Sequence, residues 1–112
     1  MTQIKELQEL VKDFITARDW QKFHTPKNIA MSIAIESAEL MEIFQWHTNE
    51  ESSSLEFINQ HRLNIEDEVA DILIYMISFV NNLDIDIEEV IKRKMSRNEH
   101  RFPIEKVKGK LA

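Results

Sequence analysis

Cysteine is absent from this 112-residue chain, which also has only one glycine and two prolines. A chain without cysteine forms no disulfide and offers no thiolate to a metal ion or a substrate. Because disulfide-free chains are typical of reducing compartments, we expect an intracellular, cytoplasmic protein. The scarcity of glycine and proline, together with 43 % hydrophobic residues, favours one domain built from long uninterrupted helices.

The chain also lacks the features of membrane-bound and nucleic-acid-binding proteins. No apolar run reaches the roughly 20 residues that span a bilayer, and Met1 is followed by an amphipathic segment instead of an apolar signal core. The net charge of −6 disfavours a general nucleic-acid-binding protein. We therefore expect neither a membrane nor a nucleic acid as a partner. Basic residues are unevenly distributed, because eight of the fourteen lie between Lys92 and Lys110.

Hydrophobic spacing predicts an all-α fold without strands. Thr25 before Pro26 provides a hydroxyl N-cap and a proline at the first helical position. Asp86 and Glu89 have the spacing of a capping box, with Asp in place of Ser or Thr. Apolar residues recur at intervals of three and four, the period of an amphipathic helix, in the segments 3–18, 26–46, 63–80 and 86–102.

The connections between these helices have no helical period. Residues 18–25 are expected to form a loop, and the polar residues 48–54 break the hydrophobic pattern. The segment 55–58 fits either a separate helical turn or the start of the third helix. The second helix is apolar on almost every side, which is typical of a central helix or of an oligomer interface.

Two pairs of acidic residues lie within the apolar faces of the second and third helices. Glu36 and Glu39 form the first pair, and Glu68 and Asp71 form the second. Residues three apart share one side of a helix, with Cβ atoms about 5–6 Å apart, so each pair presents two carboxylates together. The apolar residues expected on the same sides are Ile29, Ile33, Leu40 and Ile43 in the second helix and Ile72, Tyr75 and Phe79 in the third. The acids are therefore expected to point toward the core.

Carboxylates that point toward an apolar core need a proton or a cation to neutralise their charge. Two like charges about 5 Å apart repel by about 3 kcal/mol at an effective dielectric constant of about 20, before any cost of desolvation. Antiparallel pairing of the second and third helices would bring both pairs to one level, where protons or cations would have to neutralise them. Ligands that are all oxygen suit a hard divalent ion, Mg²⁺ first and Mn²⁺ as a substitute. The alternative is that some of these acids face solvent or pair with Arg or Lys.

Histidine is missing from both motifs, and this bears on their chemistry. Di-iron bundles use a Glu-x-x-His repeat, and none of the four histidines here follows a carboxylate by three residues. A set made only of carboxylates fits metal-assisted phosphate chemistry instead, in which Mg²⁺ binds phosphate oxygens and activates water. A divalent-metal storage or redox bundle is a less favoured alternative.

Glu36-x-x-Glu39 followed by Glu68-x-x-Asp71 resembles the E-x-x-E…E-x-x-D pattern of the MazG-like all-α nucleoside triphosphate pyrophosphohydrolases. The segments that resemble the small dCTP pyrophosphatase branch of that family are Arg18-Asp19-Trp20, Phe23-His24, Pro26, Phe44-Gln45-Trp46, Asp71 to Tyr75, Lys94-Met95, Asn98 and Arg101-Phe102-Pro103. The resemblance covers residues 4–103, so we assign 1–103 to a MazG-like domain and 104–112 to a charged C-terminal tail. One departure is Val11, where some members of the branch have a histidine, and it leaves the preferred base open.

The resemblance implies a four-helix bundle-like fold and a Mg²⁺-dependent hydrolase that cleans the nucleotide pool. Such enzymes cleave (deoxy)nucleoside triphosphates between the α and β phosphates to give a nucleoside monophosphate and pyrophosphate. We expect dCTP or a modified cytosine nucleotide as substrate. By resemblance, Glu36, Glu39, Glu68 and Asp71 would hold Mg²⁺. Either Glu36 or Glu39 would also act in catalysis by orienting the attacking water, and we favour Glu39.

Further residues are candidates for binding the substrate. Trp20 and Trp46 could stack on the base, which is worth about 1–3 kcal/mol, and the hydroxyl of Tyr75 could reach a sugar or phosphate. The full set of substrate-binding candidates is Trp20, His24, Asn28, Trp46, Tyr75, Lys94, Asn98 and Arg101. The alternatives are structural: tryptophans in a core or interface, His24 as a loop residue, the tyrosine bonded to backbone, and the basic residues in solvent.

The resemblance also implies an assembly. Family members of this size form dimers or dimers of dimers with sites between subunits, so we expect a homotetramer, with a homodimer as the alternative. A different class of function is a non-catalytic helical interaction or regulatory module that retains the fold. Release of pyrophosphate from a nucleotide in the presence of Mg²⁺ would distinguish the enzyme from the module.

Overall fold

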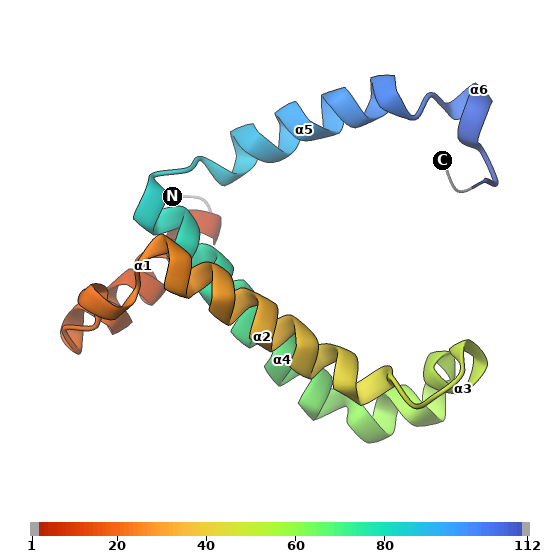
Figure 1. Cartoon of the computed structure of the whole chain (residues 1–112), viewed down its shortest axis with the longest axis horizontal. Helices are drawn as coiled ribbons and strands as arrows, with labels where there is room; N and C mark the ends of the chain where they lie inside the picture. The colour runs from red at the N-terminus through yellow and green to blue at the C-terminus, as the bar shows by residue number, and fades with distance from the viewer. Residues whose placement is uncertain (1–2, 111–112) are drawn as a thin grey trace.

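The protein is all-α, as the hydrophobic spacing predicts. The computed structural model describes residues 3–110, and this range contains no strand. None of the helices in the same range has both the length and the hydropathy of a membrane span. The elements in chain order are α1 (Gln3–Ala17), the 3₁₀ turn η1 (Gln21–Phe23), α2 (Pro26–Phe44), α3 (Asn49–Ser53), α4 (Leu55–Leu83), α5 (Ile87–Arg101) and α6 (Ile104–Val107), shown in Figure 1.

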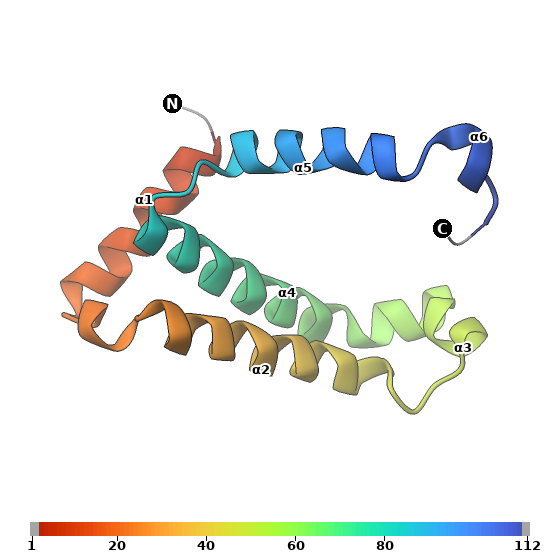
Figure 2. The same ribbon diagram turned by 45° about the horizontal axis from the view of Figure 1, so that its top comes forward.

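An antiparallel pair of long helices, α2 and α4, forms the centre of the fold. The two helices lie side by side along most of α2 (Figures 1 and 2). Ile29, near the start of α2, is the most deeply buried side chain, with only 1 % of its surface exposed. Ile33, Leu40 and Ile43 follow it at helical spacing and are half-buried. The antiparallel pairing and the buried side of α2 are therefore those that the sequence predicts.

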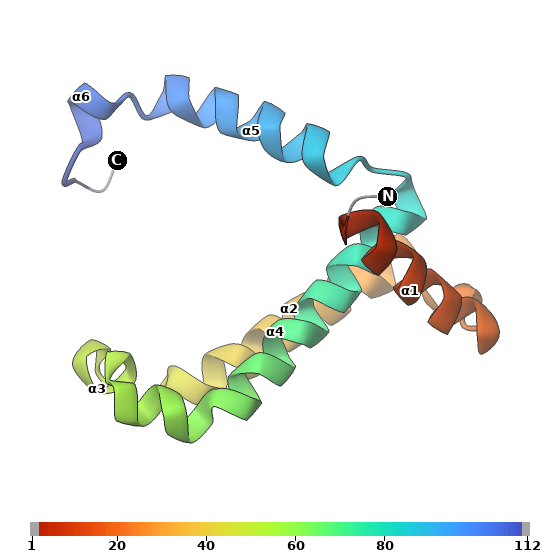
Figure 3. The same cartoon turned by 180° about the vertical axis from the view of Figure 1, so that it is seen from behind.

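Helix α1 packs against one end of this pair. It crosses near the end of α4 (Figure 3) and buries Val11 and Ile15. Nε2 of Gln8 donates a hydrogen bond to Oδ1 of Asn81 at 2.9 Å, and Nδ2 of Asn81 donates to the backbone oxygen of Gln8 at 3.0 Å. These two hydrogen bonds fix α1 relative to α4 along both helix axes.

Side chains cap the ends of the main helices where the sequence indicates. Oγ1 of Thr25 accepts a hydrogen bond from the backbone N–H of Asn28 at 3.2 Å, which confirms the predicted start of α2. Oδ1 of Asp86 accepts from the backbone N–H of Glu89 at 2.9 Å, which confirms the predicted start of α5. Asp84 ends α4 in the left-handed conformation, with φ of 56°.

The polar segment 48–54 breaks the hydrophobic pattern, but it contains a short helix. Thr48 and Glu51 form a capping box, in which each side chain accepts from the backbone N–H of the other residue at 3.1 Å, and this box starts α3. The loop predicted at 18–25 contains the short turn η1.

The alternatives for the segment 55–58 are also decided. Oγ of Ser54 accepts from the backbone N–H of Phe57 at 3.1 Å, so this segment begins α4 instead of forming a separate turn. Helix α4 therefore starts eight residues before the predicted 63. The short helix α6 lies within the predicted tail 104–112. The domain boundary at 103 stays a prediction.

Helix α5 stands apart from the rest of the chain. It extends away from the α2–α4 pair in all three views (Figures 1 to 3), and among residues 3–110 it has no extensive packing with another helix. The radius of gyration is 17.5 Å, whereas a compact domain of this length has about 13 Å. The large exposed apolar side chains include Met31, Ile35 and Met41 on α2 and Ile91 and Met95 on α5. One chain alone therefore leaves much of its apolar surface uncovered.

The burial of Ile29 predicts a graded loss of stability. Ile29→Ala should lower the free energy of unfolding by about 2–5 kcal/mol, and Ile29→Val by about 0.5–1.5 kcal/mol, because the cost follows the volume of the cavity left behind. Urea unfolding of both variants at one fixed protein concentration measures this. Equal stability of Ile29→Ala and the parent chain would contradict a core centred on the α2–α4 contact.

Candidate functional site

Three glutamates from α2 and α4 bring their carboxylates together. Oxygen atoms of Glu36, Glu39 and Glu68 lie within 4.8 Å of one another, close enough for all three to contact one ion. Glu36 and Glu68 are half-buried, and Glu39 is exposed. The antiparallel pairing of the helices produces this group, because it places the two acidic motifs at one level. We call these three residues the carboxylate centre.

Two oxygens of the carboxylate centre are buried without a partner. Oε2 of Glu36 and Oε2 of Glu68 are shielded from solvent, and neither has a hydrogen-bond partner within the described chain. The pKa of Glu36 is raised from 4.5 to about 7, first by burial and then by the neighbouring carboxyl groups of Glu39 and Glu68. Burial is also the largest cause of the raised pKa of Glu68, and its interaction with Glu36 acts in the opposite direction.

Asp71, the fourth predicted acid, is close to the carboxylate centre but not within it. Its side chain is exposed, and it is not part of the group whose oxygens lie within 4.8 Å. It is nevertheless near enough for its negative charge to raise the pKa of both Glu36 and Glu68. The structure therefore brings three of the four acids together and leaves the fourth beside them.

The residues present fit a divalent cation. Buried carboxylate oxygens without a hydrogen-bond donor are costly unless a proton or a cation neutralises them. The donor set is entirely oxygen, which suits Mg²⁺ or Mn²⁺ better than the softer transition metals.

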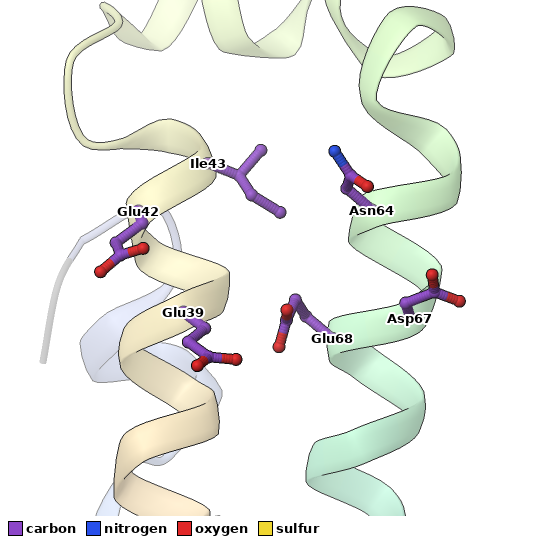
Figure 4. Close-up of a pocket in the computed structure, with 6 residues that line it drawn as sticks. All are labelled: Glu39, Glu42, Ile43, Asn64, Asp67 and Glu68. Atoms are coloured by element: carbon purple, nitrogen blue, oxygen red, sulfur yellow. The ribbon is translucent and has the colours of Figure 1, made fainter.

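A cavity of about 500 Å³ adjoins the carboxylate centre. Its lining residues come from α2 and α4 and are Glu39, Glu42, Ile43, Asn64, Asp67 and Glu68 (Figure 4). Glu39 and Glu68 point into the space between the helices, whereas Glu42 and Asp67 point to the outer sides. The cavity thus extends from the carboxylate centre toward the C-terminal end of α2.

Trp20, His24 and Asn28 lie at the opposite end of α2. Trp20 packs edge-on against Phe14, with ring centroids 5.9 Å apart. Nδ1 of His24 lies 2.8 Å from the backbone oxygen of Trp20, and the backbone oxygen of His24 accepts from Nδ2 of Asn82 at 2.8 Å. Nδ2 of Asn28 donates to the backbone oxygen of Phe23 at 3.2 Å. In the single chain, His24 and Asn28 therefore hold the η1 turn in place.

Trp46 and Tyr75 have different surroundings. Trp46 follows the C-terminal end of α2 and is 83 % exposed, more than any other large apolar side chain in the described residues. Tyr75 is half-buried on α4, one turn after Asp71. Trp20 and Trp46 flank the ends of α2, which has 19 residues and is therefore about 28 Å long. The two tryptophans of one chain cannot stack on the same base.

Lys94, Asn98 and Arg101 all lie on α5, the helix that stands apart from the α2–α4 pair (Figure 2). Within the described chain, the recorded contacts of Asn98 and Arg101 are on or next to α5. Nδ2 of Asn98 lies 3.9 Å from Sδ of Met95, and Arg101 lies over the ring of Phe102. One chain does not bring these basic and amide side chains to the carboxylate centre. A site containing both sets would need a second copy.

Three lining residues of the cavity were not singled out from the sequence: Glu42, Asn64 and Asp67. Helical spacing contains the signal for Asn64, because it lies one turn before Glu68 on the same side of α4. Ile43 lies one turn after Glu39 on α2 in the same way. A polar residue one turn from a buried acid could therefore have been named as a neighbour of the site.

Known proteins are similar to this chain over most of its length. It is 30 % identical to dCTP pyrophosphatase 1 of Bos taurus over 106 residues, which are 95 % of this chain and 63 % of that protein. It is 30 % identical to dCTP pyrophosphatase 1 of Homo sapiens over 100 residues, which are 89 % of this chain and 59 % of that protein. The chain thus spans less than two thirds of the length of these relatives.

A solved structure and a family model agree with these matches. The crystal structure of a pyrophosphatase from Archaeoglobus fulgidus superposes on this fold with a TM-score of 0.85 and 40 % sequence identity, covering 92 % of this chain and 94 % of that chain. The model of the MazG-like family matches residues 31–110, which include all of the carboxylate centre. The chain belongs to the MazG-like family.

Proposed function

We propose that this protein hydrolyses deoxynucleoside triphosphates to a nucleoside monophosphate and pyrophosphate. The observation that carries the proposal is the carboxylate centre, in which three acids converge and two buried oxygens have no partner. Relatives that are named pyrophosphatases support the reaction, and those named dCTP pyrophosphatase support dCTP or a modified cytosine nucleotide as substrate. We place the reaction in the cytoplasm because the chain has no cysteine.

In this proposal Glu36, Glu39, Glu68 and Asp71 hold Mg²⁺, with Mn²⁺ as a substitute. The ion, when bound, neutralises phosphate charge and lowers the pKa of a bound water. Glu39 is the exposed member of the carboxylate centre and also lines the cavity, so its carboxylate can orient a water that enters from there. Glu36 is more buried and lies beside it, so its role in catalysis is to hold the ion and to fix the position of Glu39.

The proposal includes a homo-oligomer, a tetramer with a dimer as the alternative. Its support is the uncovered apolar surface on α2 and α5 and the large radius of gyration. In the assembly, Lys94, Asn98 and Arg101 of one copy reach the phosphates or sugar held at the carboxylate centre of another. Trp20 and Trp46 contribute to base binding from different copies, because one chain separates them by the length of α2.

Removal of one carboxylate should abolish turnover. Loss of an outer partner of a metal ligand typically costs about 10- to 100-fold in activity, so Glu39→Gln and Asp71→Asn, which change proposed ligands, should cost more than that. Pyrophosphate release from a panel of canonical and modified deoxynucleoside triphosphates with Mg²⁺ is the measurement. Helix content by circular dichroism should remain that of the parent chain.

Glu56→Gln is the matched control for this assay. Glu56 is an exposed acid in the first turn of α4, away from the cavity, and its change to glutamine should leave the rate as it is. Near-normal rates in Glu39→Gln would refute the assignment of the ion to this centre. If the parent chain releases no pyrophosphate from any nucleotide, the non-catalytic binding module becomes the better account.

The raised pKa of Glu36 predicts how stability depends on pH without a divalent ion. A carboxyl group whose pKa is higher in the folded chain contributes stability at low pH and loses it as pH rises through the folded value. The metal-free protein should therefore become less stable between pH 4.5 and about 7. Glu36→Gln should flatten this dependence and should exceed the parent chain in stability at pH 8.

Addition of Mg²⁺ at pH 8 should make the parent chain more stable than Glu36→Gln. An ion that binds only the folded chain stabilises it by about 2.7 kcal/mol at 100 times its dissociation constant, and Glu36→Gln should lose most of this gain. Thermal unfolding from pH 4 to pH 8, with Mg²⁺ or with a chelator, measures both effects. A parent chain that gains no stability from Mg²⁺ or Mn²⁺ at pH 8 would contradict a cation at the carboxylate centre.

An acidic side chain at an exposed apolar position of α5 should disrupt the assembly. Ile91 is exposed in the single chain, and Ile91→Asp would place a charge in the proposed subunit interface. We expect light scattering to show a smaller species than the tetramer or dimer of the parent chain, with loss of turnover. Gln60→Asp, at an exposed position of α4, should keep the parental mass. A monomeric parent chain would refute the proposed assembly.

A further inference from the structure

The cavity beside the carboxylate centre has two chemically different halves. Glu39 and Glu68 form an acidic half, in which their carboxylates point toward each other across the space between α2 and α4 (Figure 4). Ile43 and Asn64 form a neutral half one turn farther along, where the two side chains face each other. On each of the two helices, the residues of the acidic and neutral halves are four positions apart, which corresponds to about 6 Å along the helix axis.

The amide of Asn64 is not used by the fold. Four other asparagine amides in the described chain have recorded contacts: those of Asn28, Asn81 and Asn82 donate to backbone oxygens, and that of Asn98 lies against a methionine sulfur. The side chain of Asn64 has no hydrogen bond or ion pair within residues 3–110. Its donor and its acceptor are therefore both available at the wall of a cavity.

Asn64 is also chemically distinct from the other polar groups that line the cavity. Those groups are carboxylates, which only accept hydrogen bonds when ionised, so Asn64 provides the one side-chain N–H donor among the lining residues. An amide that donates and accepts can pair with a base edge that has an amino group next to a ring nitrogen, as cytosine and adenine have. Ile43 opposite it offers an apolar surface for the face of the ring.

We propose that Asn64 is a specificity-determining residue that hydrogen-bonds the edge of the nucleobase, with Ile43 packed against the ring. The inference rests on the proposed function, because it takes the phosphates to lie in the acidic half. A nucleotide held there extends its sugar and base along the cavity, and the neutral half is the part that suits an uncharged ring. Asn64 acts on binding of the base and not on cleavage.

The test compares substrates with and without a base. Asn64→Leu removes both hydrogen-bonding groups at similar volume and should raise the KM for dCTP about two- to tenfold, the usual worth of a neutral hydrogen bond, with kcat within twofold. The KM for the triphosphate of abasic deoxyribose should not change, because this substrate has no base edge. Asn59→Leu, which changes an asparagine of α4 outside the cavity, should leave both values as they are.

Two further measurements separate this inference from the proposed function. The affinity for Mn²⁺ without nucleotide should be the same in Asn64→Leu and the parent chain, which excludes damage to the carboxylate centre. Calorimetry with dCTP that carries a non-hydrolysable α–β linkage measures the contribution of the base to binding even if no turnover occurs. The dissociation constant of this analogue should be higher for Asn64→Leu than for the parent chain by the same two- to tenfold. A parent chain that binds this analogue without cleaving dCTP would refute the proposed function alone.

The inference is overturned by either of two results. If Asn64→Leu weakens dCTP and the abasic triphosphate equally, Asn64 does not contact the base. If it changes neither KM nor the affinity for the analogue, the neutral half of the cavity does not bind the nucleotide.

Discussion

Mutual repulsion of carboxylates between two packed helices is the constraint on which this structure depends. Among residues 3–110 the α2–α4 contact is the largest between two helices, and Glu36, Glu39 and Glu68 lie within it. Burial raises the pKa of Glu36 and of Glu68 and so favours their protonated forms. In the proposed function, a divalent cation would neutralise these carboxylates in place of protons. The same contact therefore provides the main packing of the fold and brings the carboxylate centre together.

Local features of the fold could be predicted from the sequence because their causes are local. Thr25 and Asp86 cap their helices through side chains three residues from the N–H groups they bind, so the positions follow from residue order alone. The carboxylate centre was predictable for a related reason. Each acid pair lies on one side of an apolar helix. Antiparallel packing of the two helices brings both pairs to the same level of the contact. Thr48 and Glu51 carried an equally local signal for α3, but the polar residues around them have no hydrophobic period from which a helix could be predicted.

The predicted substrate-binding residues could not be placed relative to the carboxylate centre from the sequence, because helical periodicity is only a local signal. Periodicity shows that Lys94 and Asn98 share a side of α5, but it contains no information about which helix that side meets. Trp46 illustrates the same limit, since its side chain is 83 % exposed and its position after α2 does not indicate what it contacts. Asn64 was missed for a different reason: an asparagine on a helix is usually a solvated residue, and only the cavity distinguishes it from Asn59.

The distribution of charge links these observations. Residues 92–110 carry eight basic and two acidic side chains, although the whole chain has a net charge of −6, so the remainder of the chain is more acidic than the total suggests. Most of that basic segment belongs to α5, which stands apart, while the carboxylate centre belongs to the acidic α2–α4 pair. A triphosphate bound to a cation needs carboxylates on the side of the ion and basic groups on the side of the phosphates. One chain provides the carboxylates, whereas its basic helix α5 extends away from them. This arrangement is expected if α5 of another copy completes each site.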